Sequence, residues 1–189
     1  MHSRAGVVTK VVHLSRYIQG IADSSAFQKW FCIGCLVMLS SAVQAQEITT
    51  FILVRHAEKV LDGDKDPSLT EEGIQRALRL KELLAKTSIN AIYSTRYKRT
   101  RGTVQPLATS VGLSVREYEP RSEEAIAGML KEHAGKTVLV CGHSDTVPQI
   151  ANWLTGTTDY QEFDETDYGN VIIISVAGKG PASVTWLRY

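Results

Sequence analysis

The chain lacks the features that mark several large classes of protein. Only three of its 189 residues are cysteines, and its formal net charge is +1. It has no polybasic block and no basic stripe interleaved with aromatic residues, so nothing suggests a nucleic-acid partner. Internal repeats and long low-complexity stretches are also absent. With 43 % hydrophobic and 22 % charged residues, the composition is that of an ordinary globular domain with a real core.

The first 45 residues differ from the rest. An apolar run from Trp30 to Val43 follows Lys29 and ends in Val43-Gln44-Ala45, a small-residue pattern typical of signal-peptidase cleavage. The run is too short, and too rich in serine near its end, for a spanning helix. We therefore expect residues 1–45 to be a signal peptide, with an uncleaved anchor as the alternative. Residues 46–189 are expected to form one domain.

Removal of this leader changes the charge and the cysteine content. Four of 21 basic residues and one of 20 acidic residues leave with it, so the net charge moves from +1 to −2. Cys32 and Cys35 leave too, and one remaining cysteine cannot form an internal disulfide. That residue, Cys141, lies in an apolar run, where a buried thiol is expected rather than a nucleophile. The expected location is the periplasm or the exterior, with membrane contact only if the leader stays.

Strand-like and helix-like segments alternate after the leader. Strands are expected at 48–54, 89–93, 113–118, 137–141, 171–176 and 183–188, and helices from Thr70 and at 97–111, 123–133 and 146–154. The last two strands read as a hairpin or tight return, and strand 113–118 as an edge. Pro106 is expected to bend or divide its helix. The pattern favours an α/β fold, a single three-layer domain with a mainly parallel sheet flanked by helices on both faces.

The helix after the first strand has a predicted cap and a predicted core face. Thr70 is the expected N-cap, followed by two acidic residues in the first turn. The apolar residues expected to face the core are Ile74, Ala77, Leu78, Leu80, Leu83 and Leu84.

Two histidines each follow an apolar strand. Arg55-His56 comes after Phe51–Val54, and Gly142-His143 comes after Val138–Cys141. Ligands of open α/β sheets bind at the carboxyl ends of the strands, so these side chains are expected at one site. A neutral imidazole is a competent nucleophile toward phosphorus, and arginine offers a planar fork that matches phosphate oxygens. Each motif alone is weak, since a lone histidine at a strand end is more often structural.

A third element combines a strand end with a cluster of cations. Tyr93-Ser94-Thr95 leads into the start of a helix, where four cations fall within six residues: Arg96, Lys98, Arg99 and Arg101. A helix N-terminus after a strand is a ready anion site, although a charge cluster is by default a solvated helix face. The placement favours function for at least one of these cations.

Together these elements resemble the histidine phosphatase superfamily, which includes cofactor-dependent phosphoglycerate mutases. The resemblance covers the chain after the leader and extends to the order of the elements. Arg55-His56 matches the family's Arg-His pair, and Leu69-Thr70-Glu71-Glu72-Gly73 its Leu-Thr-x-x-Gly segment. Tyr93-Ser94-Thr95 with Arg99 and Thr103 matches the third motif, and Gly142-His143 the fourth.

The resemblance implies a role for each matched residue. His56 would be the nucleophile that carries the phosphoryl group, while Arg55, Arg99 and His143 would bind its oxygens and stabilise the transition state. Thr103 would belong to the substrate-binding set. The resemblance implies a phosphoglycerate mutase-like fold and neither a metal nor another cofactor.

The general acid does not carry over cleanly from the family. Glu123 has the most plausible spacing for the mutase-like branch, and Glu119 and Glu124 lie in the same region. In the acid-phosphatase branch an aspartate follows the second histidine directly. Here Ser144 occupies that place and Asp145 comes one residue later, where it can equally be a helix N-cap.

The sequence therefore predicts an exported phosphatase that hydrolyses a phosphomonoester through a phosphohistidine. The domain is short for the family, so an open site is expected, with a phosphorylated small molecule, glycan or protein as substrate. One alternative is a protein phosphohistidine phosphatase. Another is a catalytically silent module that binds a phosphorylated ligand, although a silent relative would be expected to lose one of the four matched side chains. The oligomeric state and the physiological substrate are not constrained.

Cleavage of the leader gives a direct prediction. If signal peptidase cuts after Ala45, mass spectrometry of the exported protein should show a chain that begins at Gln46. A full-length product recovered in the membrane fraction would instead support the uncleaved anchor.

Overall fold

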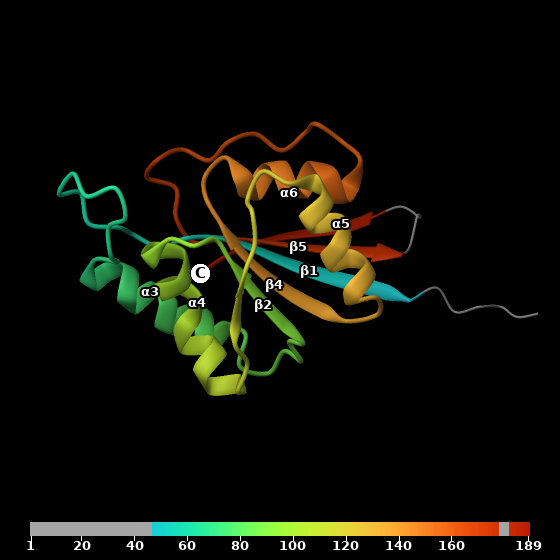
Figure 1. Ribbon diagram of the computed structural model, residues 1–189, viewed down its shortest axis with the longest axis horizontal. Coiled ribbons are helices and arrows are strands. Elements are labelled where there is room, and N and C mark those ends of the chain that lie inside the picture. Colours follow the sequence, from blue (N-terminus) through green and yellow to red (C-terminus); the bar gives the residue numbers. More distant parts are fainter. Residues whose placement is uncertain (1–46, 178–181) are drawn as a thin grey trace, which may run out of the picture. The chain divides into compact units, whose positions relative to one another are not determined.

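The computed structural model describes residues 47–177 and 182–189 (Figure 1). The predicted leader, residues 1–45, lies outside these residues, as does the connection between the last two strands. The strands are β1 (Ile48–Arg55), β2 (Ala91–Ser94), β3 (Val115–Glu117), β4 (Thr137–Gly142), β5 (Asn170–Ala177) and β6 (Ala182–Arg188). The helices are α3 (Glu71–Leu83), α4 (Lys98–Val111), α5 (Glu123–Glu132) and α6 (Thr146–Thr155). Within the described ranges, no helix combines the length and apolar character needed to span a bilayer.

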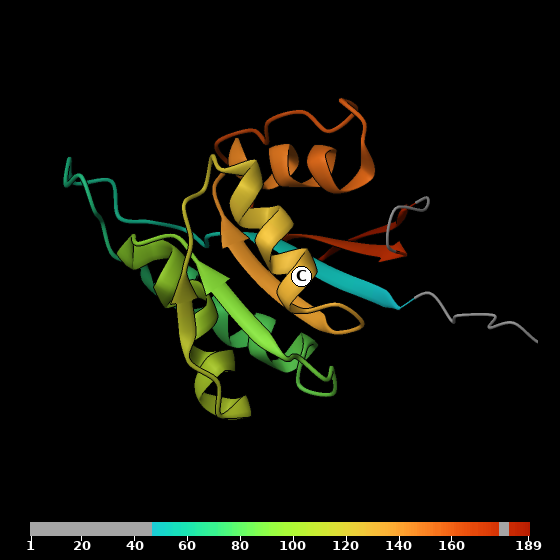
Figure 2. The ribbon, with the colours of Figure 1, turned by 45° about the vertical axis from the view of Figure 1, so that its right-hand side comes forward.

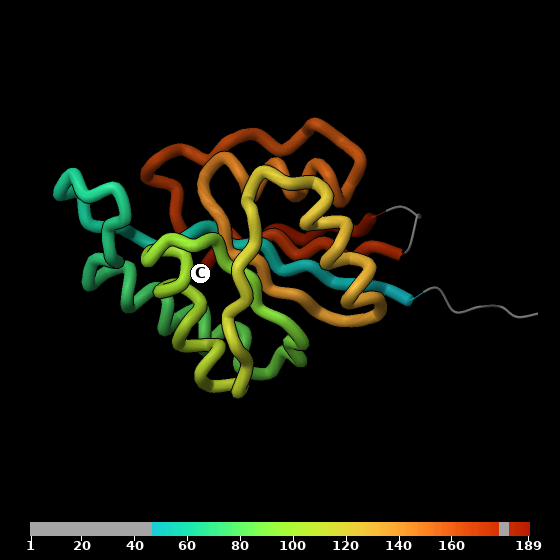
Figure 3. The backbone as a smooth tube through the Cα atoms, viewed as in Figure 1, coloured from blue at the N-terminus to red at the C-terminus, as the bar shows by residue number. Residues whose placement is uncertain are grey.

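The strands form one six-stranded sheet in the order β3-β2-β4-β1-β5-β6. β3, β2, β4 and β1 are parallel, whereas β5 is antiparallel to β1 and to β6. The mainly parallel sheet is thus confirmed, and so are the edge position of β3 and the pairing of the last two strands as a hairpin. The smooth trace in Figure 3 shows these central strands running through the middle of the fold.

Helices cover both faces of the sheet, which confirms the three-layer architecture. On one face α3 and α4 pack their buried residues, among them Leu80 and Leu107, against Ile52 and Leu139 of the central strands. On the other face α5 and α6 bury Met129 and Ile150 among the remaining strand side chains. Figures 1 and 2 show the α3–α4 pair and the α5–α6 pair on opposite sides. Each central strand is therefore apolar on both faces, as its continuous hydrophobic run requires.

The predicted core face of α3 is only partly correct. Thr70 is the N-cap, as predicted, and its hydroxyl accepts a hydrogen bond from Gly73 N–H. Ala77, Leu80 and Leu84 are buried, but Ile74 and Leu83 are 44 % and 45 % exposed. The orientation follows from Gly73, where any Cβ atom would collide with the carbonyl oxygen of Glu58. That glycine faces the loop after β1, and the buried residues spaced at 77, 80 and 84 share its side, whereas Ile74 and Leu83 flank it.

Of the two predicted effects of Pro106, to bend or to divide its helix, the division is wrong. α4 runs without interruption from Lys98 to Val111, with Pro106 inside it. It ends at Gly112, whose left-handed backbone (φ 71°) closes the last turn. The helix is held in one piece because Val104, Leu107 and Ala108 are fully buried against the sheet. This packing outweighs the single backbone hydrogen bond that proline removes.

The topology brings three strand ends together at one edge. β4 lies between β2 and β1, with Ser94 opposite Cys141 and Arg55 opposite Gly142. The chain leaves β1 toward α3 on one face and leaves β4 toward α6 on the other. Such divergence opens a crevice at the carboxyl ends of the two strands, the position where open α/β sheets bind ligands. The residues that follow β1, β2 and β4 therefore converge on that crevice.

Candidate active site

His56 follows β1 and has one nitrogen free for chemistry. Its side chain is buried, and its Nδ1 lies 2.8 Å from the carbonyl oxygen of Ala57. A carbonyl oxygen only accepts, so Nδ1 carries the proton and Nε2 keeps its lone pair. Burial lowers the pKa of His56 to about 3, with the charges of nearby Arg55 and Arg99 adding to this effect. The ring is therefore neutral at ordinary pH, with a lone pair on Nε2.

His143 faces His56 across the crevice, as predicted. The two ring centroids are 5.5 Å apart in an edge-on arrangement. Gly142 before it is needed because a Cβ atom there would crowd Thr146 Oγ1 and the Tyr118 hydroxyl. Burial lowers the pKa of His143 to about 4, and the charge of Arg99 pushes it in the same direction. Both imidazoles are thus held neutral in the absence of an anion.

Arg55 lies at the site, but most of its N–H donors are hydrogen-bonded to backbone carbonyl oxygens. Its Nη1 donates to the carbonyl oxygens of Asp164 and Asp167 at 2.7 and 3.1 Å, and its Nη2 donates to that of Glu165 at 3.1 Å. The guanidinium also stacks on Tyr168, 4.3 Å from the ring centroid. Arg55 thus holds the segment before β5, and its expected binding of phosphoryl oxygens stays a prediction.

Arg99, on the first turn of α4, is held by an aromatic ring. Its guanidinium carbon lies 4.3 Å from the centroid of Tyr97, and that ring in turn packs edge-on against His143 at 5.3 Å. The Nε atoms of Arg99 and Arg55 are both buried and without a hydrogen-bond partner among the described residues. Buried unpaired donors are costly, so two of them beside the histidines indicate that an anion completes the site.

These side chains line a cavity of about 280 Å³. Its lining residues are Arg55, His56, Lys59, Tyr97, Arg99, Pro120, Arg121, His143, Ser144, Asp145, Thr146 and Glu165. Four lining residues are cationic and two are anionic, which leaves a net positive charge for a phosphoryl dianion. The side chains of Arg121 and Glu165 at the mouth are 73 % and 75 % exposed, so the mouth is open to solvent.

Thr103 does not line the cavity. Its fully buried hydroxyl accepts a hydrogen bond from Ala57 N–H at 2.9 Å and donates to the carbonyl oxygen of Arg99 at 2.8 Å. Both capacities of the hydroxyl are thus used within the protein. Instead of the expected substrate contact, Thr103 ties the backbone after His56 to the helix turn that carries Arg99.

The structure separates the candidate general acids. Glu123 is exposed at the start of α5, and it does not line the cavity, nor do Glu119 and Glu124. Asp145 does line it, at the N-cap of α6, but its side chain makes no cap hydrogen bond. Burial by itself would raise the pKa of Asp145, but hydrogen bonding from Arg121 at 2.7 Å and its charge hold the pKa below the usual range. The role of Glu123 as an acid stays a prediction without geometric support.

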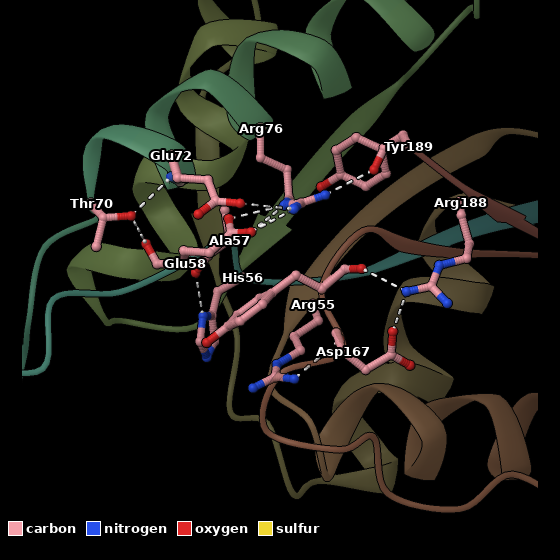
Figure 4. A network of polar contacts seen from close by, with 12 residues as sticks. Arg55, His56, Ala57, Glu58, Thr70, Glu72, Arg76, Asp167, Arg188 and Tyr189 are labelled. Carbon is pink, nitrogen blue, oxygen red and sulfur yellow. Dashed lines mark hydrogen bonds and ion pairs between the residues drawn. The ribbon is translucent and has the colours of Figure 1, made fainter.

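Several residues that matter here were missed at the level of sequence. Figure 4 shows Glu58, directly after the Arg-His-Ala segment, paired with Arg76 of α3. Arg76 Nε donates to both carboxylate oxygens of Glu58, at 2.8 and 2.9 Å, and Arg76 Nη1 donates to the carbonyl oxygen of Tyr189. This network joins the loop behind His56 to α3 and to the residue after β6. The position of Glu58 just after the Arg-His pair was a signal in the sequence that it lies near the site. No local feature of the sequence indicates that Arg76 does.

The rim residues were also unpredicted. Lys59, Arg121 and Glu165 reach the cavity from three separate loops. Tyr97 was visible in the sequence only as part of a basic cluster. Among the described residues, no group of three or more His, Cys, Asp or Glu side chains is arranged to hold a metal ion.

An open α/β sheet with two neutral histidines and two arginines at its strand ends defines a class of protein that handles phosphoryl groups. A model of the histidine phosphatase superfamily (branch 1) matches residues 51–120, the part that contains His56 and Arg99. The resemblance seen in the motifs is thus confirmed over these residues. No curated protein matches it in sequence.

Solved structures of phosphatases share the fold. A mycobacterial glucosyl-3-phosphoglycerate phosphatase is 14 % identical with a TM-score of 0.62, over 75 % of this chain and 98 % of that chain. Protein histidine phosphatase SixA, complexed with tungstate, is 16 % identical with a TM-score of 0.61, over 74 % and 96 %. A phosphoserine phosphatase mutant from Entamoeba histolytica is 18 % identical with a TM-score of 0.57, over 72 % and 95 %. At 14–18 % identity, these neighbours show that the chain shares their fold.

The burial of His56 predicts a loss of stability in mild acid. In the unfolded chain the pKa of this ring returns to about 6.5. Below that pH the ring binds a proton in the unfolded state but not in the folded state. With a folded pKa of about 3, the free energy of unfolding should fall by about 2 kcal/mol between pH 6.5 and pH 5, at 1.36 kcal/mol per unit.

Urea unfolding at several pH values, compared between the wild type and His56→Gln, measures this contribution. The variant should lose less stability over the same interval, because it has no proton to take up there. Parallel curves for the two proteins would show that His56 titrates normally in the folded state.

Proposed function

We propose that this protein hydrolyses a phosphomonoester in two steps through a phosphohistidine at His56 Nε2. The observation that carries the proposal is the hydrogen bond from His56 Nδ1 to the carbonyl oxygen of Ala57. It leaves a bare ring nitrogen in a cavity lined by cations. A weak nucleophile is best activated by fixing its tautomer and its orientation, and the backbone does both here.

In the first step, His56 Nε2 attacks the phosphorus atom. The P–N bond forms while the P–O bond to the leaving group breaks, and the leaving oxygen takes the electron pair of that bond and then a proton from solvent water. In the second step, water attacks the phosphorus, the P–N bond breaks, and inorganic phosphate leaves. Arg99 and the free Nε of Arg55 hold the equatorial oxygens in both steps, which stabilises the charge of the transition state.

His143 is suited to bind the same phosphoryl group from the opposite side of the cavity. Its ring lies within reach of the space above His56, and Tyr97 supports both His143 and Arg99. All four of the predicted side chains are therefore present and gathered. Their joint presence favours an active enzyme over a silent module that only binds a phosphorylated ligand.

The state of the carboxylates favours substrates with good leaving groups. Asp145 is bound to Arg121, and Glu165 lies 3.6 Å from Arg55. The cavity thus offers no carboxyl group that is free to protonate an alkoxide. The imidazole of a phosphohistidine on a protein is a better leaving group than the alkoxide of an alkyl phosphate. The open mouth of the cavity admits a protein or a glycan. This supports phosphohistidine hydrolysis as the second candidate function.

Export belongs to the same proposal. It is supported only by the apolar run and the small-residue pattern before Gln46. A periplasmic or extracellular phosphatase would meet phosphorylated glycans, proteins or small molecules there.

The nucleophile assignment predicts the behaviour of one variant. His56→Ala should abolish hydrolysis of p-nitrophenyl phosphate and remove an acid-labile, base-stable phosphoenzyme that the wild type forms. Arg99→Ala should retain the phosphoenzyme but lose about 10²–10³ in rate, comparable with the loss of one donor from an oxyanion hole. Cys141→Ala is the matched control, since its buried thiol has no part in the chemistry. Substantial turnover by His56→Ala would refute the assignment.

The lack of a free acid predicts a dependence on the leaving group. The rate of phosphoenzyme formation should fall by about 10²–10⁴ from an aryl phosphate to an alkyl phosphate, the range that general acid catalysis would otherwise supply. Single-turnover rates for a series of phosphomonoesters, with phosphoramidate as a further substrate, measure this. Equal rates for aryl and alkyl esters, with Asp145→Asn slowing only the alkyl ester, would instead make Asp145 the acid.

A further inference from the structure

A buried pair of hydroxyl groups lies behind His143. Thr95 follows β2, and Thr100 is in the first turn of α4. Both side chains are fully buried. Thr95 Oγ1 is 3.1 Å from His143 Nε2 and 2.8 Å from Thr100 Oγ1. Buried polar groups must satisfy one another in this setting, so the three groups form one hydrogen-bonded chain.

Only two arrangements of the protons satisfy this chain. In the first, His143 Nε2–H donates to Thr95, and Thr95 donates to Thr100. In the second, Thr100 donates to Thr95, and Thr95 donates to a bare Nε2, so that the ring carries its proton on Nδ1. The carbonyl oxygens that Thr100 could otherwise reach, those of Thr95 and Tyr97, already accept from Ser94 Oγ and from Arg101 N–H. The second arrangement therefore leaves neither carbonyl without a donor.

A bound phosphoryl group distinguishes the two arrangements. Nδ1 of His143 has no hydrogen-bond partner among the described residues, and His143 lines the cavity. An anion there needs a donor, whereas a lone pair on Nδ1 would repel it. Because the ring is neutral without a ligand, it can donate from one nitrogen only. Donation from Nδ1 thus requires that Nε2 accept a hydrogen bond from Thr95.

We propose that Thr95, backed by Thr100, is a positioning residue that fixes the proton of His143 on Nδ1 and turns this N–H toward the phosphoryl group. The inference deepens the proposed function, on which it rests for the identity of the anion. It assigns a task to Thr95, which lies outside the cavity lining. It also explains how a neutral histidine can serve as a phosphate donor without first taking up a proton.

Two-bond ¹H–¹⁵N correlation spectra of the resting protein test the tautomer directly, with His143→Gln used for assignment. In the wild type near pH 7, His143 should be protonated at Nδ1 and bare at Nε2. In Thr95→Val, which keeps the shape but has no hydroxyl, the proton should move to Nε2. A wild-type spectrum with Nε2 protonated would overturn the proposal, whatever the enzyme hydrolyses.

Binding of inorganic phosphate and vanadate gives the second readout. Thr95→Val should weaken both by roughly ten- to a hundredfold, the effect of losing a hydrogen bond to a charged group. Thr100→Val should weaken them less, and Thr95→Ser should restore wild-type binding and the wild-type tautomer. Thr49→Val is the matched control, a buried threonine that accepts a hydrogen bond from Gly135 N–H at the opposite end of β1. Unchanged binding by a folded Thr95→Val would also refute the proposal.

Loss of activity in the His56 variant and the tautomer of His143 are independent observations. If His56 proves not to be the nucleophile while His143 carries its proton on Nδ1, the positioning role of Thr95 stands and the proposed mechanism fails. If His56 is the nucleophile while His143 carries its proton on Nε2, the mechanism stands and the positioning role of Thr95 fails.

Discussion

The parallel pairing of β1 with β4 is the constraint on which the rest of the structure depends. Their register sets Arg55 opposite Gly142, so the residues that follow, His56 and His143, emerge side by side. The backbone N–H of His56 also donates to the carbonyl oxygen of Gly142, which continues the pairing past the strand end. A slip of one residue would turn the side chains of β1 to the opposite faces of the sheet and would break the alignment of Arg55 with Gly142. Hydrophobic burial of the two strands enforces this register, and the register determines the geometry of the site.

Burial also sets the electrostatic character of the site. Removing two imidazoles from water makes them neutral at ordinary pH, and two arginines nearby oppose their protonation further. Two buried Nε–H groups, those of Arg55 and Arg99, have no hydrogen-bond partner among the described residues. Such an arrangement is unfavourable until an anion accepts from them, so the proposed binding of a phosphoryl group would offset a free-energy cost that folding has left. The same burial makes the folded state vulnerable to mild acid.

The supporting contacts explain how the motif residues are held near one another. Gly73 allows α3 to approach the carbonyl of Glu58, and Thr103 ties the loop after His56 to the turn of Arg99. Neither residue reaches the cavity. Arg55 lies at the cavity yet uses most of its donors on the segment before β5, so a motif residue can combine a structural and a chemical task. A match to a motif therefore identifies a region more reliably than it identifies the role of each side chain.

Local sequence was sufficient for the elements, the three layers and the gathering of His56, His143 and Arg99. Hydrophobic runs and helix caps are local, and parallel strands must present their carboxyl ends at one edge. Local sequence was not sufficient for Glu123, which spacing favoured but the orientation of α5 leaves exposed, nor for the exposed Ile74 of α3.

The chain by itself determined which residues follow each strand, because that is a matter of order along the backbone. Only the tertiary structure decided what those residues touch. Arg76 reaches Glu58, Arg121 holds Asp145, and Thr95 meets His143 across gaps of 18, 24 and 48 positions in the sequence. These contacts depend on how α3 is rotated, where the loop after β3 runs, and how β2 is placed against β4. Rotation and placement are settled by the packing of whole helices and strands, which no short stretch of sequence encodes.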